Sequence, residues 1–139
     1  MTAPATCVRT PAGSCHVPSV LDLVEPLPGL PDTAYALEPL DEIGFLFALR
    51  GEHGTRLFAI SPGLVFPDYA PTIPAAALDA VCGAGSEPAY VLLAVVHPGP
   101  GERLAPTADL LAPIVVDCAG GRALQVVLDD DLPLRAPLG

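Results

Sequence analysis

Few residues in this chain have the type and spacing that chemistry requires, and the pair Cys15-His16 is the most suggestive of them. A cysteine beside a histidine can act as a thiol nucleophile or supply ligands to a zinc ion. Either role needs further groups in a complete arrangement, and no third ligand follows at the spacing of a zinc site. We therefore expect no catalytic or metal-binding role for this pair.

Three other motifs contain parts of known sites. Ser61–Gly63 lacks the preceding glycine of a nucleophile elbow, and Gly99–Gly101 lacks the Lys-Ser/Thr of a phosphate-binding loop. Asp129–Asp131 lacks the alternating ligands of a calcium loop. We interpret Gly99–Gly101 and the acidic run as turns, and we predict no catalytic residue, no metal site and no cofactor.

Of two further histidines, one is assigned to a turn and the other to the end of a strand. His53 lies in Gly51-Glu52-His53-Gly54, which is typical of a turn between two strands, and His97 precedes Pro98 at the end of an apolar run. We expect neither to be catalytic.

The composition favours one folded domain with a strongly acidic surface. The chain has 139 residues, of which 51% are hydrophobic and 16% charged, so it can bury one core and is unlike a disordered chain. Sixteen acidic residues face six basic ones, all arginine, and the formal net charge is -10. This charge disfavours direct binding to nucleic acid or anionic membranes and would speed encounter with a basic protein.

The sequence also predicts the compartment. The longest apolar run, Ala89–Val96, is far shorter than the roughly 20 residues of a membrane-spanning helix. The N-terminal residues lack the pattern of a signal peptide. We expect a cytoplasmic protein whose four cysteines are thiols, because their spacing indicates no disulfide framework.

Eighteen prolines divide the chain into short pieces and disfavour long helices. Apolar runs of strand length lie between them: Leu21–Val24, Phe45–Leu49, Leu57–Ile60, Ala89–Val96, Leu110–Val116 and Ala123–Leu128. Val91–Val96 is apolar at every position, which predicts a central strand covered on both sides. Two glycines between the last two runs predict a β-hairpin over 110–128.

One short helix is predicted at Ala75–Cys82, because Pro74 suits a helix start, alanine favours helix and Gly83 can end it. Residues 1–18 show no clear periodicity, so we expect a loose N-terminal arm followed by a single domain over 19–139. The predicted fold class is mostly β: a small antiparallel β-barrel, partly open and sandwich-like, with one short helix.

From Pro26 onward the chain resembles the bacterial flagellar assembly factor FliW family. The resemblance rests on ordered motifs, of which the last three are specific: Pro26–Leu30, Val65–Pro71, Thr107–Asp117 and Arg122–Leu128. The ending Leu132–Leu138 is also similar to the family's closing segment.

The resemblance implies a β-barrel regulator without a cofactor, which acts by switching between two cytoplasmic protein partners. In that family FliW binds the RNA-binding regulator CsrA and relieves its repression of flagellin translation. Unexported flagellin occupies FliW and restores repression. We expect both partners here, with a protein that is monomeric when free.

Candidate partner-binding residues come from the matched motifs, and Asp68, Asp109 and Arg135 are expected at the surface because charged side chains are rarely buried unpaired. The full predicted set is Asp68, Tyr69, Thr107, Asp109, Leu110 and Arg135. Asp109 and Asp117 replace asparagines that are usual in the family, so an amide donor is lost at each position. Two alternatives remain: a flagellin-dedicated chaperone that does not bind CsrA, and a small unrecognised enzyme.

Overall fold

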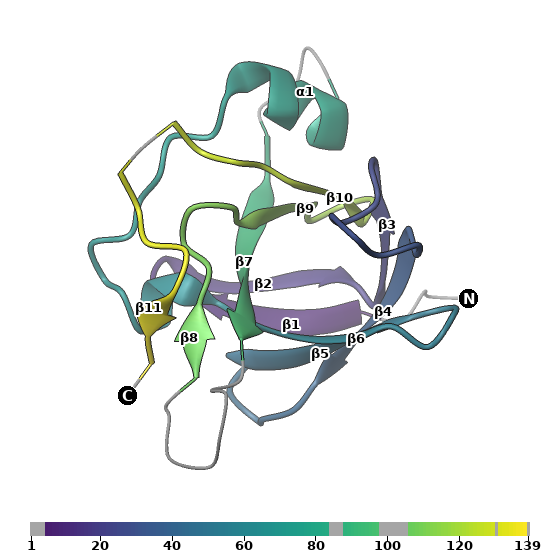
Figure 1. The fold of residues 1–139 in the computed structure, drawn as a ribbon, viewed down its shortest axis with the longest axis horizontal. Helices are drawn as coiled ribbons and strands as arrows, with labels where there is room; N and C mark the ends of the chain where they lie inside the picture. The colour runs from purple at the N-terminus through teal and green to yellow at the C-terminus, as the bar shows by residue number, and fades with distance from the viewer. Residues whose placement is uncertain (1–4, 84–87, 98–105, 130, 139) are drawn as a thin grey trace.

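A computed structural model describes residues 5–83, 88–97, 106–129 and 131–138 of the chain. Within these ranges the chain forms strands, one 3-10 helix and one α-helix (Figure 1). The strands are β1 (Ala5–Thr10), β2 (Gly13–Pro18), β3 (Val20–Leu23), β4 (Ala34–Pro39), β5 (Leu46–Gly51), β6 (Arg56–Ile60), β7 (Tyr90–His97), β8 (Thr107–Ala108), β9 (Ile114–Asp117), β10 (Arg122–Gln125) and β11 (Ala136–Pro137). The helices are η1 (Pro62–Leu64) and α1 (Ala75–Cys82).

Seven strands form a closed ring, in the order β3-β4-β5-β6-β7-β9-β10 and back to β3. The ring closes where the first half of β7 pairs with β9, so that Tyr90 lies opposite Asp117 and Leu93 opposite Ile114. Its pairs are antiparallel except for β10 with β3, which is parallel. This arrangement confirms the prediction of a mostly β fold built on a small barrel with one short helix.

Strand β7 runs through the middle of the molecule and contributes to the core on both of its faces. Val91, Leu93 and Val95 pack in the main core, while Ala94 packs in a second cluster with residues of β8 and β11. The prediction of a central strand is confirmed, and its continuous apolar sequence follows from this two-sided burial.

Helix α1 has the predicted bounds, Ala75–Cys82. Pro74 precedes its first residue, and Gly83 ends it with a φ of 88° that favours glycine. Val81 faces inward and packs with Val115 and Val126, so the helix covers the sheet at β9 and β10.

The predicted hairpin is also present, since β9 and β10 pair antiparallel with Ala123 opposite Val116. Its strands are shorter than the apolar runs, because Leu111 and Ala112 form a bend before β9 and β10 ends at Gln125. The expected turn at His53 lies between β5 and β6. Gly99–Gly101 and Asp130 lie outside the described residues.

The expectation of a loose arm over residues 1–18 is wrong for residues 5–18. These residues form the antiparallel hairpin β1-β2, in which Cys7 lies opposite His16. Val8 and Val17 are 0% and 1% exposed and belong to the main core. Each hairpin strand therefore contributes to the interior, although its short alternation of apolar and polar residues gave little signal.

Candidate partner-binding surface

Strands β8 and β11 bring two of the predicted motifs together. Ala108 of β8 lies opposite Ala136 of β11, and Thr107 lies opposite Pro137. Just beyond β8, the Leu110 amide donates to the Pro133 carbonyl at 3.1 Å. The segment carrying Thr107–Leu110 therefore lies directly beside the segment carrying Arg135.

Tyr69 joins this region from the loop that follows η1. Its hydroxyl donates to the Leu110 carbonyl at 2.7 Å, and its ring packs on the cluster that contains Leu110 and Ala136. Burial, followed by the negative charge of Asp109, raises the pKa of the Tyr69 hydroxyl above its usual value. The hydroxyl consequently stays protonated as a donor, and Tyr69 serves to hold the loop against β8.

Asp109 is the main correction among the predicted site residues. It is 8% exposed and does not lie at the surface. Its Oδ1 accepts from the Leu111 and Ala112 amides at 3.1 and 3.0 Å. Because these backbone donors satisfy the carboxylate, a charged residue is tolerated here without a basic partner. Asp109 therefore shapes the turn before β9, and Leu110 is likewise buried.

The exposed part of the region combines charge with apolar side chains. Asp68 and Arg135 are exposed, and Thr107 is half-buried. Beside them in sequence stand three exposed apolar residues, Leu64, Val65 and Leu134, the last 56% exposed. The loop that follows η1 reaches β8 and β11 through Phe66 and Tyr69, which pack in the same cluster as Ala108 and Ala136. We call the surface formed by Leu64, Val65, Asp68, Thr107, Leu134 and Arg135 the η1–β11 face.

Sequence reasoning missed Leu64, Val65 and Leu134. They stand within or next to the matched motifs, but a leucine or valine in an apolar sequence is normally assigned to the core. Only their exposure in the folded chain distinguishes them from buried neighbours such as Ala136.

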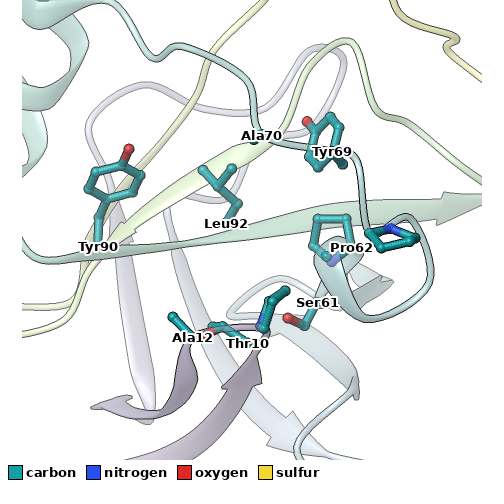
Figure 2. A pocket seen from close by; sticks show the side chains of 11 residues that line it. Thr10, Ala12, Ser61, Pro62, Tyr69, Ala70, Tyr90 and Leu92 are labelled. Carbon is teal, nitrogen blue, oxygen red and sulfur yellow. The ribbon is translucent and has the colours of Figure 1, made fainter.

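A pocket of about 340 Å³ lies between the β1-β2 turn, η1 and β7. Figure 2 shows Tyr90 and Leu92 of β7 lining it together with Tyr69, Ala70, Pro62, Ser61, Thr10 and Ala12. The Ser61 hydroxyl donates to the Arg9 carbonyl at 2.6 Å and the Thr10 hydroxyl to the Gly13 carbonyl at 2.8 Å. These hydroxyl protons are therefore already engaged within the protein.

The lining decides what this pocket can do. Among its described lining residues none is His, Cys, Asp, Glu, Lys or Arg. Tyrosine is therefore the only titratable side chain among them. The proline and aromatic walls of the pocket suit an apolar side chain. Because Tyr69 belongs both to this pocket and to the packing beneath the η1–β11 face, the two features are neighbours.

No group of three or more His, Cys, Asp or Glu side chains is placed to hold a metal ion in the described part of the chain. Of the helices within that part, none is long and apolar enough to cross a membrane.

The comparisons with known proteins agree with the motifs and the fold. A flagellar assembly factor FliW from Thermotoga neapolitana is 31% identical over 88 residues, which cover 63% of this chain and 58% of that relative. The chain thus matches less than two thirds of that relative's length. A crystal structure of the flagellar assembly factor FliW superimposes with a TM-score of 0.74 at 20% identity, covering 96% of each chain. The family described as FliW protein matches residues 9–138, and the chain therefore belongs to the FliW family.

Proposed function

We propose that this chain is a cytoplasmic flagellar assembly factor that acts by binding proteins and is monomeric when free. It binds a CsrA-type RNA-binding regulator, which relieves repression of flagellin synthesis, and it binds flagellin. Membership of the FliW family supports this proposal, as does the name of its Thermotoga relative.

The η1–β11 face is the observation that carries the proposal. Its exposed apolar residues Val65 and Leu134 lie close in sequence to two exposed charged residues, Asp68 and Arg135. Protein interfaces commonly combine an apolar centre with a polar rim. The adjoining pocket, walled by Tyr69 and prolines, can receive an apolar side chain of the partner.

The net charge favours a basic partner over nucleic acid. Sixteen acidic and six basic residues give a charge of -10, which repels phosphate and attracts a basic RNA-binding protein. We therefore propose that this chain binds the regulator itself, not the RNA.

Calorimetric titration with a purified CsrA-type regulator and with flagellin tests the proposal. Leu134→Asp places a charge in the η1–β11 face, and we expect it to weaken binding of at least one partner by about tenfold or more. Val127→Asp is the matched control, because Val127 is 73% exposed and lies outside that face. Both variants should keep the melting temperature of the parent. Equal binding by the parent and Leu134→Asp would exclude this face.

The same titrations separate the alternatives. A flagellin-dedicated chaperone would bind flagellin and leave the regulator unbound. Binding of neither partner, together with turnover of a compound from a metabolite panel, would favour an enzyme.

A further inference from the structure

Two cysteines from opposite ends of the chain lie side by side. Cys15 belongs to β2 and Cys118 to the turn between β9 and β10. Their Sγ atoms are 3.3 Å apart, although 103 residues separate them in sequence. Both are free, half-buried thiols that pack against the main core.

The surrounding backbone holds these two segments together. Gly121, in the same turn as Cys118, has a φ of 76°, and a Cβ at this position would lie 2.8 Å from the Val20 carbonyl oxygen. The same Cβ would lie 3.1 Å from the Pro18 side chain, at the end of β2. The turn is therefore packed closely against the segment that carries Cys15, and the approach of the two sulfurs belongs to the fold.

We propose that Cys15 and Cys118 are a redox-sensitive pair, which a peroxide converts into a reversible disulfide that fastens the β1-β2 hairpin to the barrel. A disulfide requires sulfurs about 2.0 Å apart, so a small shift of two already adjacent side chains is enough. Disulfides of intracellular proteins are commonly transient and redox-sensing.

The reaction balances with hydrogen peroxide as the oxidant. The Cys15 sulfur attacks one peroxide oxygen, the O–O bond breaks, and Cys15 becomes a sulfenic acid as water leaves. The Cys118 sulfur then attacks the Cys15 sulfur, the S–O bond breaks, and a second water leaves. Two thiols are oxidised and one peroxide is reduced to two waters. A small dithiol restores both cysteines by exchange.

The order of the two steps follows from the surroundings of Cys118. Burial, followed by the contact with Cys15, raises the pKa of the Cys118 thiol to about 12. Its thiolate is accordingly scarce at neutral pH, and the thiolate is the form that attacks peroxide. We therefore assign the first attack to Cys15; in the second step the Cys118 thiol gives its proton to the hydroxide that leaves Cys15 as water.

The test treats the folded full-length protein with hydrogen peroxide and maps its peptides without reduction. We expect one linked peptide pair containing Cys15 and Cys118. Because the new bond closes a long loop, the melting temperature should rise by about 5 °C or more, and dithiothreitol should reverse both changes.

Variants exclude the competing links. Cys15→Ala and Cys118→Ala should each abolish the linked peptide and the rise in melting temperature. Cys7→Ser and Cys82→Ser should retain both, and Cys82 is the sharper control because its side chain lies close enough to influence Cys118.

The parent protein alone can overturn the proposal, so it does not depend on any variant folding. A link between Cys82 and Cys118, or Cys15 oxidised to a sulfinic acid with Cys118 still a free thiol, would each contradict it. An oxidised protein that melts no higher than the reduced one would refute the fastening of the hairpin.

Discussion

Asp109 shows how the setting of one residue changes its role. A charged side chain in a matched motif suggested a surface contact, yet the carboxylate lies inside and accepts from two backbone amides. The carbonyl oxygen of its neighbour Leu110 accepts a hydrogen bond from the Tyr69 hydroxyl. Substitutions here should therefore act on folding before they act on binding.

Replacing Asp109 by Ala and by Asn tests this role. The alanine leaves the Ala112 amide, which is buried, without its acceptor, so we expect a loss of about 1–3 kcal/mol in the free energy of unfolding. Asparagine keeps an Oδ1 acceptor, so the Asp109→Asn variant should lose less of the free energy of unfolding. Urea denaturation measures both, and an alanine variant as stable as the parent would show that the carboxylate does not hold the turn.

His53 and Asp32 form a second residue-scale feature, which the sequence did not reveal. The His53 side chain is 71% exposed and its Nδ1 contacts the buried Asp32 carboxylate. This carboxylate also accepts from the His53 backbone amide at 3.2 Å. The hydrogen bond with Asp32, followed by its negative charge, raises the pKa of His53. The Thr55 hydrogen bond and then those of His53 lower the pKa of Asp32, although burial opposes this.

The sign of the pH dependence follows from these directions. His53 binds its proton more tightly in the folded state. Its contribution to the free energy of unfolding is therefore complete below about pH 6.5 and is lost as pH rises through the folded-state pKa. For Asp32 the contribution is present above about pH 3.8 and is lost as pH falls through its folded-state pKa. The pair should stabilise the fold most between these two values.

We expect the melting temperature of the parent to fall more between pH 6 and pH 8 than that of His53→Ala. His16→Ala, at an exposed position of β2, is the matched control and should follow the parent. The difference should shrink in high salt, because the His53 ring is exposed to solvent. Parallel profiles for the parent and His53→Ala would contradict this role.

At the scale of elements, the β1-β2 hairpin is docked by backbone contacts as well as by its buried valines. The Arg9 amide donates to the Gly44 carbonyl at 2.8 Å. Gly44 has a φ of 84°, and a Cβ there would lie 2.8 Å from the Cys7 carbonyl oxygen. The absence of a side chain at Gly44 therefore permits the close approach of β1 to the loop between β4 and β5.

Gly44→Ala should destabilise the fold more than Gly54→Ala. Both glycines have positive φ, and only Gly44 has backbone atoms within contact distance of an added Cβ. We expect a loss of about 1 kcal/mol for Gly54→Ala from the φ alone, and a further 1–3 kcal/mol or so for Gly44→Ala. Urea denaturation checks the difference, and amide hydrogen exchange should show β1 opening first in Gly44→Ala. Equal losses of stability in the two variants would show that β1 shifts away from an added Cβ with little loss of free energy.

At the scale of the whole molecule, the net charge of -10 should govern how fast a basic partner arrives. We expect association with a CsrA-type regulator to slow as salt rises, while dissociation changes less. Stopped-flow or surface-based kinetics over a salt series measures both rates. Association that is independent of salt would show that the charge does not steer the partner.

Two exposed residues provide opposed variants for the same measurement. Asp68→Asn removes a negative charge and should slow association, whereas Arg135→Gln removes a positive charge and should speed it, each within about threefold. Changes of the same sign in both variants would indicate local contacts in place of long-range steering.

The sequence alone determined the features whose signals are local. Helix α1 was predicted with its observed bounds, because Pro74, three alanines and Gly83 act on the backbone within a few residues. The apolar runs that became β5, β6 and β7 were evident because consecutive apolar residues fill most of each strand, and part of each is buried. Together with the proline spacing, they indicated a mostly β fold with one short helix.

The tertiary structure decided the features that depend on partners distant in sequence. The β1-β2 hairpin has few apolar residues, and Val8 and Val17 belong to the core only because the hairpin packs against the barrel. Strand β4 alternates only briefly before Pro39, and its pairing with β3 and β5 makes it a strand. Leu134 is exposed and Leu110 is buried, although both are leucines in matched motifs. Cys15 and Cys118 lie side by side, although they are far apart in sequence. Both facts depend on how the whole chain packs and are not properties of local sequence.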